Sequence, residues 1–440
     1  GFGIEEPRAL TIEEIRTIED KYAAAAVRAQ KAGFDGVELH ACGYYMGQQF
    51  LSSTANIRTD EYGGNPENRS RFYTNIIGKI REACGTDFGL VVKQAVMEAG
   101  EQGGITMEEG MFYANKFLTE GADGIEVMGG SWKPVPDIDD IPSTADKPGR
   151  MLGLSAVVRK AVLSMPGEKK NPVFIGGGRT YLPALAEEAL AEGKCDLGHG
   201  LLAEPHLVEY MEQDRCEEVR PCIGCNLCAD DQLSYNRHIR CSCNAVLGNG
   251  ENDYTMEPAA VIKKVLVVGG GIAGMEAART AARRGHKVTL VEQKDHLGGQ
   301  LDYAVAPPYK DNLKQLYPYY EKQLELNGVE VLLNTTADEA YVASRKPDAV
   351  IWACGVRPAV LPIPGFEKPI VSSAKEVLLG KTVGSHIVII GGGVVGCETA
   401  ELLLQQGKTV TIVEMLDTLA GKMAATTRSI LMGHLKGHEL

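Results

Sequence analysis

The feature of this sequence that most restricts its fold is a glycine pattern placed between two apolar runs. Residues 264–292 read as a strand, a GxGxxG turn, a helix and a second strand that ends in an acid. Such glycines permit a tight turn, close approach of a pyrophosphate and close packing of the helix, and the acid can bind a ribose hydroxyl. We therefore predict a Rossmann-like dinucleotide-binding unit. Its expected cofactor contacts are Gly269, Gly271, Gly274, Glu292, Gly299 and Gln300.

The same arrangement returns at residues 386–414, which suggests a second nucleotide-binding domain inserted in the first. Two dinucleotide sites in one chain indicate FAD together with a nicotinamide. An acid that ends the second strand, with no arginine beside it, favours a free ribose 2′-hydroxyl and thus NADH over NADPH. The expected contacts here are Gly391, Gly393, Gly396 and Glu414.

The N-terminal half alternates helical patterns with short apolar runs. Helices are expected at 11–33, 107–121 and 182–193, and strands at 34–40, 90–96, 122–130, 172–178 and 194–200. This rhythm predicts a parallel sheet with helices outside it. Polar residues at the strand ends favour a TIM barrel, whose chemistry lies there, and an open doubly wound sheet is the alternative. A closed barrel needs eight strands, so we expect the chain to be a piece of a larger polypeptide.

Several residues at these strand ends could carry chemistry. His40 could hydrogen-bond a substrate carbonyl, and Tyr44 or Tyr45 could deliver a proton. Alternatively, His40 only satisfies loop carbonyls. Lys93 could place a cation near an anionic flavin ring, or could form a plain surface ion pair. The run Gly176, Gly177 and Gly178 could hold a phosphate through backbone N–H groups.

Cysteines are concentrated in one segment, with seven of the eleven between Cys195 and Cys243. Cys222, Cys225 and Cys228 are separated by two-residue gaps, and Cys241 follows after twelve intervening residues. Three closely spaced thiolates and a distant fourth are typical of an iron–sulfur cluster. A structural zinc site is the alternative. Cys243 competes with Cys241 for the fourth position.

Composition excludes several classes of function. Of 440 residues, 44% are hydrophobic and 23% charged, as in ordinary globular proteins. A net charge of −13 with no basic run argues against nucleic acid or an anionic membrane surface as a partner. No apolar run approaches the length of a membrane span, and the N-terminus does not resemble a signal peptide. We expect a cytoplasmic protein, which could form oligomers.

Taken together, these motifs resemble the 2,4-dienoyl-CoA reductase and trimethylamine dehydrogenase group, the multidomain branch of the old yellow enzyme family. The most specific pieces are RTDEYGGNPENRSRF at 58–72, CIGCNLC with its later cysteine, and the two GxGxxG units. The resemblance implies part of an FMN-binding TIM (β/α)8 barrel, a [4Fe–4S] segment, an FAD-binding Rossmann-like domain and an inserted NAD(P)H-binding domain. We expect these at residues 1–214, 215–260, 261–384 and 385–440.

The resemblance also implies residue roles. Cys222, Cys225, Cys228 and Cys241 would bind the cluster, and Asn244, three residues after Cys241, favours that cysteine over Cys243. His40 falls on the carbonyl-binding position, Tyr45 on the proton donor and Lys93 on the basic residue beside FMN. The FMN phosphate loop would include Gly176, Gly177, Gly178 and Arg179. Two positions depart from the family pattern. Gly43 stands where the family often has a second His or Asn, and the segment 195–205 is shorter than in the family and lacks its phosphate-binding arginine.

The function implied is an NADH-dependent ene reductase. NADH would reduce FAD, the cluster would pass single electrons to FMN, and FMN would give hydride to an activated alkene in an enoyl-CoA, enoate or enone. His40 would steady the enolate oxygen and Tyr45 would protonate carbon. The alternatives are an amine dehydrogenase of the trimethylamine dehydrogenase type, a degenerate flavoprotein without FMN, and a zinc-stabilised nucleotide-sensing module.

Overall fold

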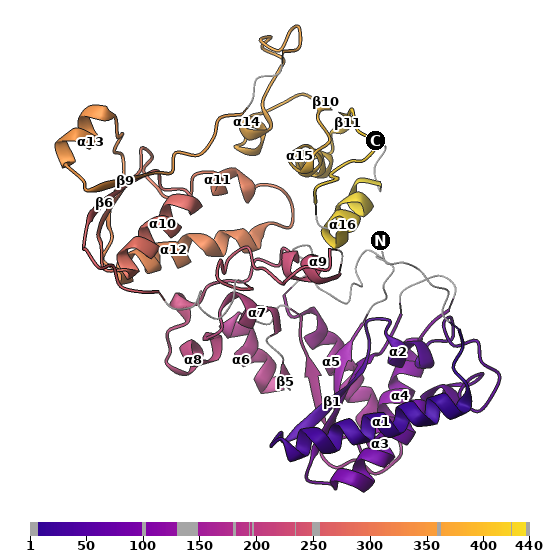
Figure 1. Cartoon of the computed structure of the whole chain (residues 1–440). Coiled ribbons are helices and arrows are strands. Elements are labelled where there is room, and N and C mark those ends of the chain that lie inside the picture. Colours follow the sequence, from indigo (N-terminus) through magenta and orange to yellow (C-terminus); the bar gives the residue numbers. More distant parts are fainter. Residues whose placement is uncertain are drawn as a thin grey trace. The chain divides into compact units, whose positions relative to one another are not determined.

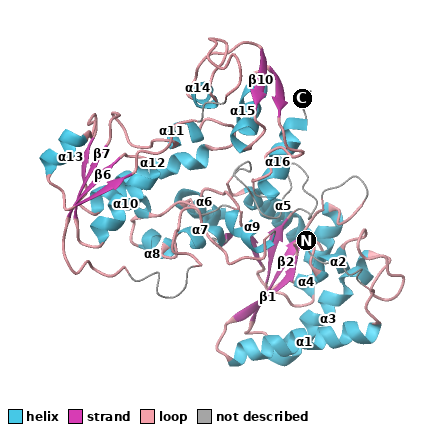
Figure 2. Ribbon diagram, turned by 45° about the horizontal axis from the view of Figure 1, so that its top comes forward, coloured by secondary structure: helices cyan, strands magenta, loops and turns pink. Residues whose placement is uncertain are grey.

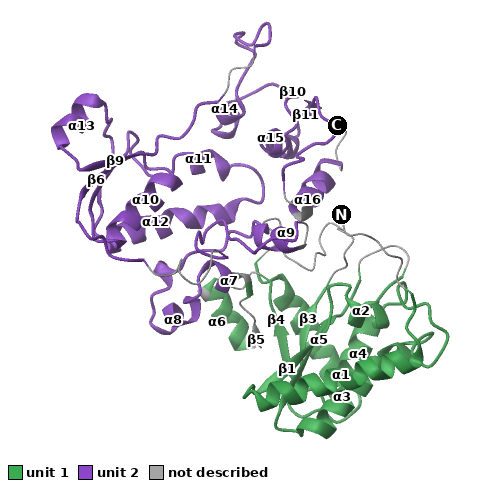
Figure 3. Ribbon diagram, in the orientation of Figure 1, with its two compact units in different colours: residues 1–142, 147–198 green, residues 143–146, 199–440 purple. Residues whose placement is uncertain are grey.

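The structure is a computed structural model. It describes residues 8–98, 103–129, 148–178, 182–192, 194–195, 198–233, 235–248, 256–358, 362–423 and 425–436. The chain divides into two compact units (Figure 3). Unit 1 comprises residues 1–142 and 147–198, and unit 2 comprises residues 143–146 and 199–440. Each unit is described by itself.

Unit 1 is built around a five-stranded parallel sheet whose strands follow one another in sequence order. The strands are β1 (Gly36–Ala41), β2 (Gly89–Ala95), β3 (Gly124–Met128), β4 (Val173–Gly176) and β5 (Lys194–Cys195). A doubly wound sheet reverses its strand order at a switch point, whereas a (β/α)8 barrel does not. The sequential order therefore agrees with the expected barrel architecture, and each of the five strands overlaps a segment predicted from the sequence.

Helices alternate with these strands. They are α1 (Ile12–Lys31), α2 (Met46–Leu51), α3 (Pro66–Cys84), α4 (Met107–Thr119), α5 (Arg150–Ser164) and α6 (Pro183–Glu192). Thr11 begins α1 and Thr106 begins α4 with a capping box, in which each threonine and a glutamate three residues on satisfy backbone N–H groups reciprocally. Asn65 caps α3, and Pro66 occupies its first turn, where a missing N–H costs nothing.

The core of unit 1 lies between the sheet and these helices. Phe72, Ile76 and Ile80 of α3 recur at helical spacing and are fully buried. Leu90 and Val92 alternate on β2 and are also fully buried in the same cluster. Figure 2 shows β1 and β2 side by side, with α1 to α4 grouped around them. This packing leaves the intervening side chains of the strands on the opposite face of the sheet.

Unit 2 begins with a segment of short helices. They are α7 (Gly198–Ala203), α8 (Leu207–Glu212), a 3₁₀ turn (Cys216–Glu218) and α9 (Leu227–Leu233). This is the segment in which sequence periodicity fails and the cysteines gather.

A Rossmann-like fold follows in unit 2. Its parallel sheet has the order β8-β7-β6-β9, with β6 (Lys264–Val268), β7 (Lys287–Val291), β8 (Glu330–Leu332) and β9 (Ala349–Trp352). The accompanying helices are α10 (Ile272–Arg283), α11 (Leu301–Ala304), the 3₁₀ helix η3 (Asp311–Gln315), α12 (Leu316–Leu326) and α13 (Glu339–Arg345). Apolar residues of β6, α10 and α12 share one core, which fixes α10 against the strand that precedes it.

A second, smaller βαβ unit ends the chain (Figure 1). It consists of α14 (Ala374–Leu378), β10 (His386–Ile390), α15 (Val394–Gln405), β11 (Thr409–Val413) and α16 (Ala425–Lys436). Strands β10 and β11 pair in parallel, as the repeated glycine pattern predicts. The expected fold class, a partial barrel followed by Rossmann-like domains, is thus confirmed. Among the described residues, no helix is both long and apolar enough to cross a membrane.

Candidate functional site

Three polar side chains form one row across the sheet of unit 1. The strand register pairs His40 of β1 with Lys93 of β2, and Lys93 with Glu126 of β3. Side chains paired in this way lie on the same face of a sheet. The register continues to Ile175 of β4. On β1, β2 and β4 the residues in register with this row alternate with buried residues, so the row lies on the face opposite the helices, which is the interior face of a barrel.

Lys93 and Glu126 form an ion pair. The Lys93 side chain is largely buried and that of Glu126 is 6% exposed, so this is not the surface pair considered as an alternative from the sequence. Burial lowers the pKa of His40, the charge of Lys93 lowers it further, and Glu126 opposes both. His40 is therefore predominantly neutral near pH 7, a form in which the imidazole can donate one N–H group.

Tyr45 lies next to His40, because the chain turns back directly after β1. Tyr45 is the residue that precedes α2, and its ring centroid lies 5.5 Å from that of His40. Its side chain is 51% exposed. The phenol of Tyr45 can therefore contact a ligand bound at the carboxyl end of the strands. The structure thus brings the predicted pair His40 and Tyr45 together at the carboxyl end of β1, with Lys93 on the next strand.

The glycine run after β4 is described in part. Gly176 is buried, and a Cβ atom there would lie 2.7 Å from the carbonyl oxygen of Met151 on α5. Gly176 therefore permits helix α5 to pack closely on the sheet. Gly178 has φ +84°, and its carbonyl accepts a hydrogen bond from the N–H of Gly149. Arg179 lies outside the described residues.

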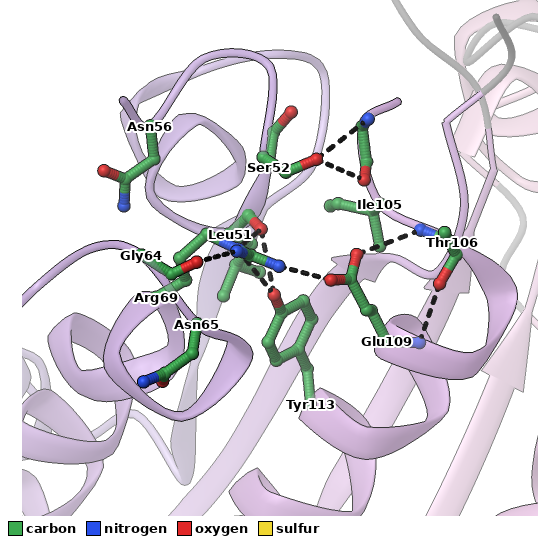
Figure 4. A network of polar contacts seen from close by, with 12 residues as sticks. Leu51, Ser52, Asn56, Gly64, Asn65, Arg69, Ile105, Thr106, Glu109 and Tyr113 are labelled. Carbon is green, nitrogen blue, oxygen red and sulfur yellow. Dashed lines mark hydrogen bonds and ion pairs between the residues drawn. The ribbon is translucent and has the colours of Figure 1, made fainter. Parts of the chain in front are cut away.

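The segment at 58–72, the most specific part of the sequence resemblance, joins elements of unit 1 (Figure 4). Arg69 is 4% exposed and donates hydrogen bonds to the carbonyls of Leu51 and Gly64 and to the Tyr113 hydroxyl. It also forms an ion pair with Glu109 of α4. The loop before α3 is thereby tied to α2 and α4. The contacts of Arg69 are made within the protein, which indicates a structural role for this part of the motif.

The four predicted cluster cysteines are neighbours in unit 2. Gly224 and Asn226, with φ +67° and +56°, turn the chain between Cys222 and Cys228. The pKa of Cys222 is raised to about 12, chiefly by burial and then by the nearby thiols of Cys225, Cys241 and Cys228. Burial and the thiols of Cys225 and Cys241 likewise raise the pKa of Cys228 to about 11.

Cys241 and Cys243 differ in a way that separates their roles. The pKa of Cys241 is lowered, first by a hydrogen bond that the Cys243 thiol donates to it, and that of Cys243 is raised. The N–H of Cys243 also points at the Cys241 sulfur, at 3.4 Å. Cys241 is thus the more thiolate-like of the two, and thiolates are the ligating form. This geometry favours Cys241 as the fourth ligand and gives Cys243 a supporting position.

The donor set fits an iron–sulfur cluster. Backbone N–H groups of Gly224, Ala229 and Asn244 point at the cysteine sulfurs, and such bonds tune cluster potentials. In the described part of the chain, no group of three or more His, Cys, Asp or Glu side chains is arranged to hold a metal ion. The cysteine spacing, three thiols at two-residue gaps and a more distant fourth, is the pattern typical of a cluster.

The first glycine pattern lies between β6 and α10. A Cβ atom at Gly274 would lie 1.8 Å from the carbonyl oxygen of Gly269, whereas one at Gly271 would meet nothing closer than 3.8 Å. Gly274 therefore allows the helix to pack, and Gly271 leaves room for a ligand. Glu292 accepts hydrogen bonds from the N–H groups of Gly270, at 2.7 Å, and Lys294, at 3.0 Å. The carboxylate is thus held at the glycine turn, where a ribose would lie.

The loop that contains Gly299 and Gln300 lies against this turn. Gly298 pairs with Gly271, and the Cα of Gly271 would be 2.8 Å from a Cβ atom at Gly299. Gln300 directly precedes α11. The predicted FAD contacts Gly271, Glu292, Gly299 and Gln300 therefore gather at one end of the β6–β7 sheet, and the residues fit a dinucleotide.

The second glycine pattern repeats these distances. A Cβ atom at Gly396 would lie 2.0 Å from the Gly391 carbonyl oxygen, and one at Gly393 would meet nothing within 4 Å. Glu414 accepts hydrogen bonds from Gly392 N at 2.7 Å and from the next two backbone N–H groups, at 2.8 and 2.9 Å. These N–H groups lower the pKa of Glu414, which keeps the carboxylate ionised.

Some residues around these sites were missed by the sequence reasoning. Glu126 could have been found, because it is an acid within the otherwise apolar strand GIEVM. Gln48 and Glu98, which hold the loop before Tyr45, gave no such signal, since their pairing spans fifty residues. Arg220 also gave none: it donates to the Ala203 carbonyl and the Tyr319 hydroxyl, and its charge acts on Cys241.

Comparison with known proteins agrees with this arrangement. Residues 3–218 match the NADH:flavin oxidoreductase / NADH oxidase family, and residues 263–440 match the pyridine nucleotide-disulphide oxidoreductase family. Over 97% of its length the chain is 41% identical to an NADH oxidase of Thermoanaerobacter brockii, and over 98% it is 37% identical to a cinnamate reductase of Clostridium sporogenes. The chain spans 65% and 66% of the length of these two relatives.

Solved structures extend the comparison. A 2-naphthoyl-CoA reductase in complex with 2-naphthoyl-CoA matches with a TM-score of 0.88 and 30% identity, covering 98% of this chain and 65% of the other. Amine dehydrogenases are also among the relatives. Both modules and their order are thus shared with multidomain flavin enzymes. The chain belongs to the NADH:flavin oxidoreductase / NADH oxidase family, in its 2,4-dienoyl-CoA reductase and trimethylamine dehydrogenase group.

Proposed function

We propose that the protein is an NADH-dependent ene reductase that reduces an activated C=C bond in an enoyl-CoA, enoate or enone. The observation that carries the proposal is the pairing of His40 with Tyr45 at the end of β1, beside Lys93. Alkene reduction requires two protein groups: a hydrogen-bond donor to the carbonyl oxygen and a proton donor, such as a phenol, to the α-carbon. Relatives named cinnamate reductase and 2-naphthoyl-CoA reductase support this substrate class.

The cofactors would be held by residues already described. Lys93 and the loop at Gly176–Gly178 would hold FMN, and Gly271, Glu292 and the Gly299 loop would hold FAD. Cys222, Cys225, Cys228 and Cys241 would hold a [4Fe–4S] cluster. When bound, these groups supply hydride and single-electron transfer between NADH and the alkene.

The protein side chains would handle the oxygen and the proton. His40, whose pKa partial desolvation and the Lys93 charge lower, would donate its N–H to the substrate carbonyl oxygen and stabilise negative charge as it develops there. Tyr45 would donate its phenolic proton to the α-carbon, and its exposed position allows solvent to restore that proton. The Lys93–Glu126 pair would place a fixed cation where negative charge builds up on the flavin side.

The second dinucleotide site would take NADH. Glu414 presents an ionised carboxylate, and the residues after it are the exposed, uncharged Met415 and Leu416. A carboxylate accepts hydrogen bonds from ribose hydroxyls and repels a 2′-phosphate, which would need a nearby arginine. Ten cysteines among the described residues carry free thiols, which supports a reducing compartment such as the cytoplasm.

The proposal is tested by separating the two half-reactions in the full-length, cofactor-loaded protein. We expect NADH to reduce the wild-type flavins and a panel of cinnamate, enoyl-CoA and enone substrates to reoxidise them. The Tyr45→Phe variant should keep the reductive half-reaction and lose alkene turnover by about 10²–10⁴-fold.

An amine dehydrogenase is the second candidate, since relatives carry that name. It would give the opposite result: reduction of the flavins by a methylated amine and not by NADH. Absence of FMN from the purified protein would instead indicate a degenerate site.

A further inference from the structure

We propose that Gln48 is a positioning residue that holds Tyr44 in a left-handed conformation and thereby places Tyr45 against His40. The inference deepens the proposed function and rests on Tyr45 as the proton donor. Its structural part, the restraint of the loop between β1 and α2, can be tested without turnover.

The loop has two consecutive residues of positive φ. Gly43 has φ +64° and Tyr44 has φ +58°. The left-handed region is open to glycine but unfavourable for a tyrosine, whose Cβ approaches the following carbonyl. A bulky residue stays in this region only when its surroundings restrain it. Tyr44 directly precedes the predicted proton donor, so its backbone angles set the direction in which Tyr45 leaves the loop.

Two glutamines restrain the Tyr44 peptide groups from both sides. The N–H of Tyr44 donates to Oε1 of Gln48 at 2.7 Å. The carbonyl of Tyr44 accepts a hydrogen bond from Nε2 of Gln49 at 2.8 Å. Release of Tyr44 to an ordinary right-handed or extended conformation would break both bonds, so the side chains stabilise the strained form directly.

The side chain of Gln48 is itself held by Glu98. Its side chain is fully buried, and its Nε2 donates to Oε1 of Glu98 at 2.7 Å. Glu98 also accepts from Ser52 Oγ at 2.7 Å and from the N–H of Ile105 at 3.0 Å. A carboxylate accepts but does not donate, so Nε2 of Gln48 faces Glu98 and its Oε1 must face Tyr44. The orientation of the amide is therefore determined by Glu98.

The other end of the loop is held independently. The Tyr73 hydroxyl donates to the carbonyl of His40 at 2.7 Å. Gly43 leaves space for the two rings, because a Cβ atom there would lie 3.1 Å from the Tyr45 ring and 3.6 Å from Nε2 of His40. With His40 fixed by Tyr73, the remaining freedom of the pair lies at Tyr44, and that is the point that Gln48 restrains.

The first readout is hydrogen exchange of the Tyr44 amide, which requires no substrate. In wild type we expect slow exchange, and in Gln48→Ala we expect exchange at least about 10-fold faster in the segment 41–46. The matched control is Gln30→Ala, which removes an exposed glutamine with a similar side-chain bond, to the Cys84 carbonyl. That variant should leave exchange in 41–46 unchanged.

The second readout is turnover of the cofactor-loaded, full-length protein. Misplacement of Tyr45 should lower kcat for alkene reduction by about 10–100-fold in Gln48→Ala. KM for the alkene should stay within about twofold, because Tyr45 acts on the proton and not on binding. Since Gln48 is buried and its removal could prevent folding, the exposed Gln49→Ala provides a second variant, with a smaller change of the same sign in both readouts.

A rescue distinguishes positioning from general destabilisation. Tyr44→Gly makes the left-handed conformation accessible without restraint. In that background, Gln48→Ala should cost several-fold less in kcat than it does in wild type. Equal losses in both backgrounds would overturn the inference, as would unchanged exchange at Tyr44 in Gln48→Ala. An inactive wild type with faster Tyr44 exchange in Gln48→Ala would overturn the proposed function and leave the restraint standing.

Discussion

At the scale of single residues, the charges of Lys93 and Glu126 both act on His40. Burial and the Lys93 charge lower its pKa, so the unfolded chain binds a proton at this position more readily than the folded one. The contribution of His40 to stability is therefore present above the usual imidazole range and lost as pH falls through the lowered pKa.

We predict that stability falls on acidification more steeply for wild type than for His40→Asn. Urea unfolding at several values between about pH 5 and 8 measures this difference. The variant, which cannot take up this proton, should have a flatter profile at the acidic end. Parallel profiles for the two proteins would show that His40 is not the titrating group.

Glu414 provides a second test at this scale. Replacing it with Ala removes the charged acceptor expected to bind the ribose, and such hydrogen bonds contribute about 1.5–3 kcal/mol. KM for NADH in flavin reduction should rise about 10–100-fold, while reduction of the flavins by dithionite stays unchanged. An unchanged KM for NADH would place the ribose elsewhere.

Residues differ in how far the sequence reveals them. The glycines and terminal acids of the two nucleotide units could be predicted, because few residue types satisfy a backbone that must turn, pack and approach a ligand at fixed spacing. Gln48 could not be predicted, since its importance depends on a contact with Glu98, fifty residues away. Such pairings are tertiary and leave no local pattern.

At the scale of elements, Arg69 of α3 connects this helix to α2, to α4 and to the loop that precedes it (Figure 4). Arg69→Ala would leave Glu109 without its ion-pair partner and would remove one donor each from the carbonyls of Leu51 and Gly64. Removing one partner of a buried ion pair costs about 3–5 kcal/mol. We predict this loss in the free energy of unfolding. Arg16→Ala, which removes the exposed pair with Glu61, should cost at most about 1 kcal/mol.

The cysteine segment gives an element-scale prediction with a built-in control. Cys241→Ser should abolish binding of iron and acid-labile sulfide, whereas Cys243→Ser should retain both, because Cys243 donates to Cys241 and does not replace it. Quantified iron and sulfide in the two purified variants measure this difference. The reverse result would make Cys243 the ligand.

The sequence predicts the strands of unit 1 better than it predicts helix α3 or the cysteine segment. The five strands of unit 1 were found, because short apolar runs between polar turns are readable. Helix α3 was not, since its first turns are polar and its apolar stripe of Phe72, Ile76 and Ile80 begins only afterwards. Residues 215–250 show little sequence periodicity and, where described, form only a 3₁₀ turn and the short helix α9, so cysteine spacing identified this segment.

At the scale of the whole molecule, two modules follow one another along the chain, with the cysteine segment between them. The barrel-type module matches the NADH:flavin oxidoreductase / NADH oxidase family and the Rossmann-like module matches the pyridine nucleotide-disulphide oxidoreductase family, in the order the motifs predict. We propose that electrons enter from NADH at the second module and would leave to the alkene near His40 and Tyr45. That direction separates a reductase from a dehydrogenase built of the same parts.

The most direct test is an anaerobic NADH titration of the full-length protein with quantified FMN, FAD, iron and sulfide. We predict that NADH bleaches both flavins and the cluster, and that an added enone, enoate or enoyl-CoA restores the oxidised spectrum. Flavins that stay oxidised in NADH but are bleached by a methylated amine would contradict this direction of electron flow.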